Sequence, residues 1–550
     1  MVTKMLSAKG ETMSTVKGIV LDVVNRRRFP GEVAISGGRI ESVREVDGEV
    51  PSRYILPGFV DAHMHVESSM LVPTEFARLA LRQGTVAAVC DPHEIANVCG
   101  VEGIDFMIRN GREARLKFAF GAPSCVPATP FETAGAELDA EAVGKLLDRE
   151  DIPFLGEMMN WPGVLEEDVE VMAKIRAAKD RGKPVDGHAP GLTGERAASY
   201  IAAGISTDHE CASLEEALGK LEKGMLILIR EGSAARNFDE LIPALEKYPG
   251  RIMFCSDDKH PDDLQQGHIN ALAARALRRG LDMWSVLEAC SAVPVRHYGL
   301  DVGLLQEGDP ADFVVVRDPE SMEVQETWIG GEPVFDGDRV HLPELEVERV
   351  NTFASHFPEP EDFRIRWEGD SFPVIEASEG SLLTGKTWLR LPRKDDELLA
   401  SPEQGINKIA VVCRYRRAAP AVGFVRGFGL REGGIASSVA HDSHNIVAVG
   451  ASDAELARAV DLVMRHRGGI SVAGPDGEDI LPLPVAGLMS DRPGEEVSAG
   501  YKRITRMARE LGSPLRAPHM LLSFMALLVI PSLKISDRGI FDAERFEFHT

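Results

Sequence analysis

The sequence has few cysteines, and no pair of them marks a thiolate metal site. Its seven cysteines are scattered over 550 residues, and none forms a CxxC motif. The lack of CxxC argues against a cysteine-based zinc site. An odd number of cysteines without a pairing pattern predicts reduced thiols and a cytoplasmic protein.

Long apolar runs and positive charge are also scarce. The first residues, "MVTKMLSAKGETMS", contain no apolar core of the kind that a signal peptide needs. The longest apolar run, "MLLSFMALLVI" at 520–530, is too short to span a bilayer and predicts a buried element. Lysine and arginine total 61 against 86 aspartates and glutamates, a net charge of −25. This excess argues against nucleic acids and anionic membranes as partners, but not against a small neutral substrate.

The chain is long enough for two or three domains. Residues 17–50 alternate short apolar runs with turn signals, which predicts meandering β structure. From residue 55, apolar runs with polar ends alternate with helical patterns in eight units over about 200 residues. The helical patterns lie at 74–83, 165–182, 195–203, 213–223 and 238–247. This α/β rhythm predicts a (β/α)8 barrel. A doubly wound open sheet is the alternative, but its Gly-rich phosphate turn is absent.

Residues 346–550 are predicted to form a separate α/β domain, behind an acidic and proline-containing boundary. Strand-like runs, "KIAVVCRY" and "NIVAVG", precede a helix at 453–467 with a buried apolar stripe. Ser452 and Glu455 form a capping-box pattern at its start, and Gly468 is expected to close it.

The residues that end the apolar runs of the barrel segment indicate a site. "FVDAHMH" places His63 and His65 two positions apart in a strand, so that both rings face one side. Other runs end in Asp91 and His93, Glu157, His188, His209 and Asp257. In a barrel these ends converge on the face where barrel enzymes build their sites. We therefore favour a metal or catalytic site over separate surface residues.

Four histidines and two carboxylates are more ligands than one zinc ion uses. The proposed set is His63, His65, Glu157, His188, His209 and Asp257. Six such ligands fit two divalent metal ions, with Glu157 as a bridging carboxylate. Nitrogen and oxygen ligands suit Mn²⁺, Fe²⁺ or Zn²⁺. Two metals would lower the pKa of a shared water, and Asp257 is placed to take its proton as a general base.

Nine segments then match a known family in order, and together they span nearly the whole chain. They are "PGFVDAHMHVESSM", "DPHEIANVCG", "GHAPGLTG", "STDHE", "IREGSAARN", "CSDDKHPDDL", "HDSHNIVAVG", "LPLPVAGLMS" and "IPSLKISDRG". By these segments the chain resembles the adenine deaminases of the amidohydrolase superfamily. HxH alone would indicate only the superfamily, whereas "ESSM", "DPHEIAN" and the C-terminal segments are more specific.

The resemblance implies a metal-dependent barrel at 57–300, flanked by a small β-sandwich built from residues 1–56 and 301–345. It implies hydrolytic deamination of adenine to hypoxanthine and ammonia by a metal-activated hydroxide. Two divalent metals are expected on the same six ligands, manganese first and iron or zinc as alternatives. The superfamily often bridges its metals with a carboxylated lysine, but "FLGEM" offers Glu157, as in the adenine deaminases. We expect a homo-oligomer, taken as a dimer.

Other residues near these segments have two interpretations each. Glu67 and Glu94 are both candidates to supply a proton at N1 of the ring. Arg230 and Ser233 are candidates for purine binding, with a loop-stabilising hydrogen bond as the alternative. Asp91 and His93 would either orient the metal ligands, which we favour, or hold a further metal.

Histidines outside the ligand set raise the same question. In "AHDSHN", residues 440–445, His441 and His444 fit a polar turn held by its own hydrogen bonds, which we favour. The alternative is that the loop packs over the barrel mouth and excludes water from the substrate. For His260 and His268 we favour a structural role over metal ligation.

Two rival functions remain. One is another amidohydrolase reaction on a cyclic amide or related heterocycle, and the other is a catalytically inactive binding protein. The full ligand set argues against an inactive relative. A deaminase acting on nucleic acid would need H-x-E with P-C-x-x-C, which this chain lacks.

Overall fold

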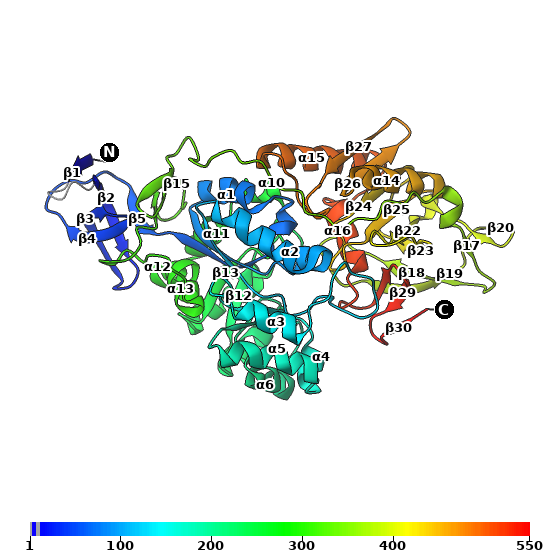
Figure 1. Ribbon diagram of the computed structural model, residues 1–550, viewed down its shortest axis with the longest axis horizontal. Coiled ribbons are helices and arrows are strands. Elements are labelled where there is room, and N and C mark those ends of the chain that lie inside the picture. The colour runs from blue at the N-terminus through cyan, green and yellow to red at the C-terminus, as the bar shows by residue number, and fades with distance from the viewer. Residues whose placement is uncertain (1–2, 7–11, 550) are drawn as a thin grey trace.

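The computed structural model describes residues 3–6 and 12–549 (Figure 1). The predicted N-terminal segment starts at residue 1, so its residues 1–2 and 7–11 lie outside this description. A β-rich unit lies at one end, an α/β unit in the middle and a second mixed unit at the other end. Within the described ranges, no helix is long and apolar enough to cross a membrane.

Two distant segments of the chain build the first sheet. Its strand order is β16-β15-β14-β5-β2-β3-β4, with β1 beside β2. These strands are β1 Thr3–Leu6, β2 Thr12–Asp22, β3 Arg27–Ser36, β4 Arg39–Glu45, β5 Tyr54–Pro57, β14 Phe313–Val316, β15 Val324–Ile329 and β16 Glu332–Phe335. The segments join where β5 and β14 run antiparallel. Phe313 stacks on Trp328 in the core of this unit, with ring centroids 5.2 Å apart. The sheet thereby anchors both ends of the central unit.

The central unit alternates strands and helices. Its strands are β6 Phe59–Met64, β7 Thr85–Cys90, β8 Lys117–Phe120, β9 Leu155–Met158, β10 Val185–Gly187, β11 Thr207–Asp208, β12 Leu226–Arg230 and β13 Ile252–Cys255. Its helices include α1 Pro73–Arg82, α2 His93–Arg112, α3 Ala140–Leu147, α5 Val169–Asp180, α6 Gly194–Ala203, α7 Leu214–Glu222 and α11 Ile269–Arg278. The pairs within β6-β7-β8, β9-β10 and β11-β12-β13 are all parallel. Parallel pairing fits strands that are joined through helices.

The predicted helix at 238–247 is wrong as a single element. The structure has two short helices there, α8 Phe238–Leu241 and α9 Ala244–Lys247. Pro243 lies between them, and a proline carries no N–H for the helical hydrogen-bond ladder. The break was therefore visible in the sequence.

The C-terminal unit contains an eight-stranded sheet in the order β19-β18-β23-β22-β25-β24-β26-β27. These strands are β18 Phe372–Glu376, β19 Gly385–Leu389, β22 Ile406–Val412, β23 Ala421–Arg426, β24 Gly434–Ser437, β25 Ile446–Gly450, β26 Gly469–Gly474 and β27 Gly477–Pro482. Later elements are α15 Gly494–Glu510, α16 Pro518–Ser523, β28 Leu533–Ser536, β29 Gly539–Asp542 and β30 Glu547–Phe548. Helix α14, Asp453–His466, packs on β24, β25 and β26.

The ends of α14 follow the sequence pattern in part. The Ser452 side chain accepts a hydrogen bond from the backbone N–H of Glu455, as a helix N-cap does. At the other end the C-cap residue Arg467 takes the left-handed conformation, with φ 55°, and Gly468 after it also has a positive φ, 128°. Gly468 closes the helix as expected, because its backbone N–H donates to the Val463 carbonyl at 3.0 Å.

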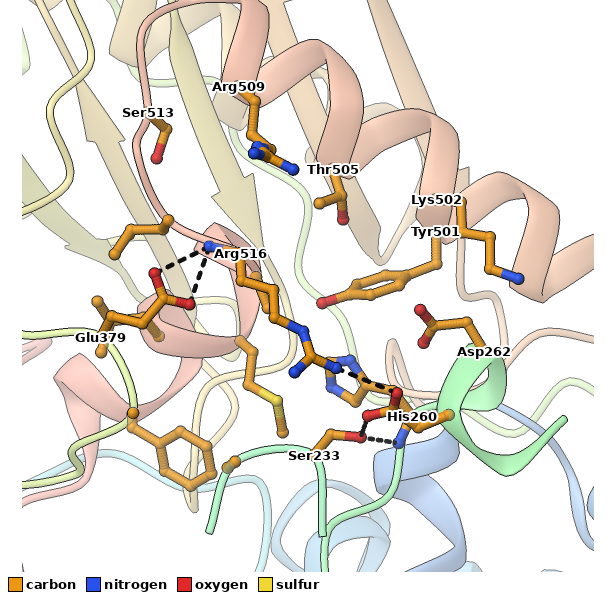
Figure 2. Close-up of a pocket in the computed structure, with 18 of the residues that line it drawn as sticks. Ser233, His260, Asp262, Glu379, Tyr501, Lys502, Thr505, Arg509, Ser513 and Arg516 are labelled. Carbon is orange, nitrogen blue, oxygen red and sulfur yellow. Dashed lines mark hydrogen bonds and ion pairs between the residues drawn. The ribbon is translucent and has the colours of Figure 1, made fainter. Parts of the chain in front are cut away.

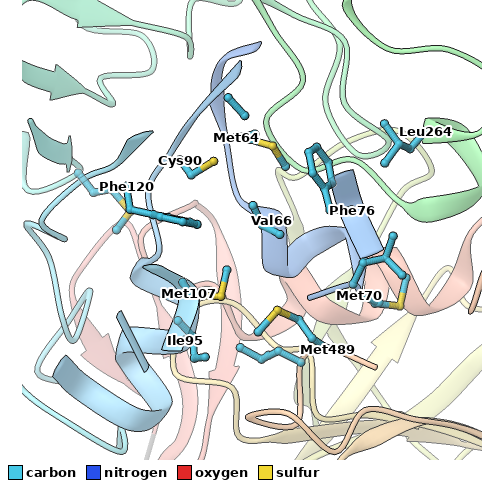
Figure 3. Packing of buried hydrophobic residues seen from close by; sticks show 14 of the residues in the cluster. Met64, Val66, Met70, Phe76, Cys90, Ile95, Met107, Phe120, Leu264 and Met489 are labelled. Carbon is cyan, nitrogen blue, oxygen red and sulfur yellow. The ribbon is translucent and has the colours of Figure 1, made fainter. Parts of the chain in front are cut away.

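The C-terminal unit is packed firmly on the central one. The backbone N–H of Ser490 donates to the Met70 carbonyl at 2.8 Å, and Gly494 donates to the Glu75 carboxylate at 3.1 Å. Met489 belongs to the same buried apolar cluster as Met70 and Ile95 (Figure 3). Met70 follows the carboxyl end of β6, where the predicted ligands lie. The C-terminal unit is therefore fixed beside that end.

Candidate metal centre and active site

Glu157, in β9, lies at the centre of a histidine cluster. Its Oε2 is 3.0 Å from Nδ1 of His188 and 3.1 Å from Nε2 of His209. Its Oε1 is 3.6 Å from Nε2 of His65. Burial opposes its charge, but the neighbouring histidines hold the pKa of Glu157 well below its usual range. One carboxylate thus faces several imidazole rings, as a bridging ligand would.

His63 supplies an observation that bears directly on metal binding. Its Nε2 lies 3.8 Å from Glu157 Oε2 and 3.9 Å from Asp257 Oδ1. Although buried, this nitrogen has no hydrogen-bond partner in the part of the chain that the structure describes. Buried polar atoms ordinarily have partners. An orphaned imidazole nitrogen that faces two carboxylates fits a metal ligand.

Asp257 follows β13 in a left-handed backbone conformation, with φ 54°. Non-glycine residues rarely adopt it, and such strain gathers at functional sites. Its Oδ1 is 3.3 Å from Nε2 of His65, and its Oδ2 accepts a 2.6 Å hydrogen bond from Arg230. Burial opposes the charge, but the Arg230 guanidinium holds the pKa of Asp257 well below its usual range.

The donor atoms form overlapping groups. Those of His63, His65 and Asp257 lie within 4.8 Å of one another, and so do those of His63, Glu157 and His209. The groups share His63 and contain only nitrogen and oxygen donors, which suit Mn²⁺, Fe²⁺ or Zn²⁺. The residues present therefore fit a divalent metal.

Asp91 and His93 adjoin this cluster, and His93 also lines the cavity beside it. Asp91 Oδ2 accepts a 2.8 Å hydrogen bond from the backbone N–H of Glu157, and its carbonyl is 3.0 Å from Nδ1 of His65. Nδ1 of His93 is 3.5 Å from both Asp91 Oδ2 and Glu157 Oε1. Asp91 thus fixes two of the predicted ligands, as an orienting partner would. Donor atoms of His93, Glu94 and Asp442 also lie within 4.8 Å of one another, so a further metal stays a hypothesis.

Glu210 is a site residue that the sequence interpretation missed. Both of its oxygens accept hydrogen bonds from Arg230, and Oε1 lies 3.5 Å from Nε2 of His209. Its position directly after His209 in "STDHE" was the available signal. Arg230 thus joins Glu210 to Asp257 at the wall of the site.

Ser233 lies apart from the cluster. Its hydroxyl donates to Asp263 at 2.6 Å and accepts from the backbone N–H of His260 at 3.0 Å. Both Ser233 and His260 line a separate cavity of about 850 Å³ (Figure 2). The loop-stabilising hydrogen bond is present, whereas purine binding by Ser233 stays a prediction. His268 bonds Asp61 at 2.7 Å and Thr85 at 2.7 Å, which is the expected structural role.

A smaller cavity of about 40 Å³ adjoins the cluster. Glu94 lines it, whereas Glu67 does not. Glu67 accepts from the backbone N–H of Ile95 at 3.1 Å, and burial raises its pKa to about 7. The opposite side of the cavity comes from the C-terminal unit and includes His441 and Phe524.

The comparisons with known proteins agree with this geometry. Residues 54–334 match the amidohydrolase family, the class of metal-dependent hydrolase to which such a fold and cluster point. Residues 381–547 match the adenine deaminase C-terminal domain. The adenine deaminase of Salinibacter ruber is 56% identical over 97% of this chain and 98% of its own length. The adenine deaminase of Methanosarcina barkeri is 49% identical over 98% of this chain and 99% of its own length. The chain belongs to the adenine deaminase family.

Proposed function

We propose that this chain hydrolyses adenine to hypoxanthine and ammonia. The observation that carries the proposal is the buried cluster around Glu157, in a chain whose relatives over nearly their whole length are named adenine deaminases. In this reaction a water oxygen bonds to C6 of adenine, the C6–N bond breaks, and the amino group leaves as ammonia with a proton taken from water.

The site sits at the strand ends of a (β/α)8 barrel. This is supported by parallel bridges that connect the separate strand groups, Ala122 with Leu155 and Met64 with Asp257. The backbone N–H of Ser206, directly before β11, donates to the carbonyl of Val185 in β10 at 2.9 Å, which connects these two strands. The barrel at 57–300 carries a β-sandwich from residues 1–56 and 301–345, followed by the α/β domain at 346–550.

The cluster would hold two divalent metal ions, with manganese as the first choice and iron or zinc as alternatives. Their ligands are His63, His65, Glu157, His188, His209 and Asp257. The orphaned Nε2 of His63 and the shared position of Glu157 support this assignment. When bound, such metals lower the pKa of water and polarise the atom under attack.

The chain's own residues then handle protons and position the groups. Asp257 accepts the proton of the attacking water and passes it to the leaving amino group. Arg230 aligns Asp257, and its link to Glu210 keeps it in place. At N1 of the ring Glu94 is preferred to Glu67, because only Glu94 lines the cavity. Burial opposes its charge, but His441 and His444 hold the pKa of Glu94 well below its usual range, so Glu94 would relay to N1 the second proton of the attacking water. Asp91 and His93 keep the ligands oriented.

Adenine is the partner, and no nucleic acid is expected, because the net charge of −25 would repel a phosphate backbone. A cytoplasmic location is supported by the seven cysteines, all described and all free thiols. The homodimer remains a prediction.

A substrate panel tests the function. Protein loaded with Mn²⁺ should release ammonia from adenine and leave dihydropyrimidines intact. Ring opening of a dihydropyrimidine without ammonia release from adenine would replace the proposal by cyclic amide hydrolysis.

A further inference from the structure

Two histidines of the C-terminal unit hold Glu94 of the central unit. Nδ1 of His441 is 2.5 Å from Oε1 of Glu94, and Nε2 of His444 bonds the other oxygen, Oε2. The three residues are between 0% and 5% exposed. Both oxygens of one carboxylate are therefore fixed from a segment about 350 residues away in sequence. Hydrogen bonds between such buried groups are stronger than in water, which raises their orienting effect.

This finding revises the interpretation of "AHDSHN". The turn does have its own hydrogen bond, from the backbone N–H of His444 to the Ala440 carbonyl at 2.7 Å. Its two histidines nevertheless point to Glu94 across the boundary between the units. The polar-turn interpretation is incomplete, and the packing alternative describes the loop better.

His441 also connects Glu94 to an apolar surface. Its ring stacks on Phe524, with centroids 4.6 Å apart and an interplanar angle of 8°. Its backbone N–H donates to the Ser523 carbonyl at 3.0 Å. Lys534 donates to the carbonyls of Phe524 at 3.0 Å and Leu382 at 2.8 Å. We call the apolar residues that line the cavity from this side the roof: Leu382, Phe524, Leu527, Val529 and Ile530.

The roof lies across a narrow space from the charged cluster. The cavity of about 40 Å³ is far below the roughly 300 Å³ at which ligand pockets begin, so it is too small for a purine ring. A planar heterocycle is ordinarily held by apolar walls and a few placed polar groups. Around the cavity the cluster wall is mostly charged and the roof is apolar. The roof must therefore move away from the cluster to admit a base.

We propose that the C-terminal domain carries half of the adenine site. The roof opens to admit adenine and closes on one face of its ring, and His441 and His444 are positioning residues that hold Glu94 against the ring edge. Because His441 both stacks on Phe524 and bonds Glu94, closure of the roof and placement of Glu94 are one event. This inference rests on the proposed function and extends it to specificity for a flat, neutral heterocycle.

We call the two bonds from His441 and His444 to Glu94 the clamp, and a double-mutant cycle tests it. His444→Ala should lower kcat/KM for adenine about 10- to 100-fold at unchanged metal content, as losses of orienting partners do. In a Glu94→Gln background, His444→Ala should lower kcat/KM only slightly further. The effects of two residues on kcat/KM are not additive when one acts through the other. His444→Gln keeps a donor and should recover part of the loss. If His444→Ala does not fold, His444→Gln measured in the same cycle carries the test.

His519 provides a matched control. It is a buried histidine of the same unit that does not line the cavity, and among the described residues its hydrogen bond is to the Ser471 carbonyl, at 2.9 Å. His519→Ala should therefore lower the melting temperature without changing kcat/KM of the folded protein.

The roof is tested through the Michaelis constant. Phe524→Ala should raise the KM for adenine at least about tenfold, as expected when one large apolar contact is lost, whereas Phe524→Leu should stay closer to wild type.

The outcomes separate the two proposals. Active wild-type protein with unchanged kinetics in the His444 and Phe524 variants would overturn the inference alone. So would strictly additive losses in the cycle. Metal-loaded wild-type protein that releases no ammonia from adenine would instead overturn the proposed function.

Discussion

Arg230 donates a 2.6 Å hydrogen bond to Oδ2 of Asp257, so the carboxylate that faces the histidines is held from behind by a buried guanidinium. The other oxygen, Oδ1, points to Nε2 of His65 at 3.3 Å. One oxygen is thus used for alignment while the other faces the cluster. This division of roles suits a carboxylate that must stay charged and aligned with a reacting water.

Asp257→Asn should keep the fold but lower turnover by about 10²- to 10⁴-fold, the usual cost of losing a positioned base. The amide cannot accept a proton, although its shape preserves the packing. Turnover should be measured on protein with verified metal content. Asp258→Asn is the matched comparison, because Asp258 lines the same cavity and accepts from Ser68 at 2.5 Å. Near-normal turnover in Asp257→Asn, with a large loss in Asp258→Asn, would move the base to Asp258.

Glu157→Gln should lower the number of tightly held metal ions below two per chain. A neutral amide bridges two cations poorly. The side chain at position 157 would also no longer present a negative charge to His188 and His209. Metal should be counted by elemental analysis after gel filtration. Glu210→Gln serves as the control, since Glu210 bonds Arg230 beside the cluster. Two retained metals in Glu157→Gln would remove Glu157 from the ligand set.

The predicted ligands converge because their signal is local. A strand alternates its faces, and parallel strands present their ends on one side, so His63, His65 and Asp257 were placed by pattern alone. The link between Glu94 and His441 spans 347 residues and joins two units. No periodicity encodes how two separately patterned units dock, so the roof and the clamp on Glu94 could not be derived. Glu210 was missed for a different reason. The end of that strand carries two adjacent polar residues, His209 and Glu210, and the pattern favoured only His209.

Removal of metal with a chelator should abolish ammonia release. It should also lower the melting temperature, because ions that bind only the folded chain stabilise it. Addition of Mn²⁺ should restore activity as the metal content approaches two per chain, with Fe²⁺ and Zn²⁺ compared in parallel. Full activity in protein shown to be free of metal would contradict the proposed centre.

Glu132 should make stability depend on pH. It is buried, its Oε1 accepts from Thr129 at 3.2 Å, and its Oε2 has no partner among the described residues. Burial raises the pKa of Glu132 to about 8, with nearby Asp442 adding to the effect. An unfolded glutamate titrates near about 4.3. Between these values the folded state binds more protons than the unfolded state, so stability falls as pH rises through this window.

Glu132→Gln removes the titrating proton while keeping an acceptor for Thr129. Its melting temperature relative to wild type should therefore rise from pH 5 to pH 8 and then level off. Melting curves at unit steps from pH 5 to pH 9 would measure this difference. Glu137→Gln, at an exposed carboxylate of the same segment, should give a difference that does not change with pH. A pH-independent difference for Glu132→Gln as well would show that Glu132 is already ionised in the folded protein at pH 5, against the direction of its raised pKa.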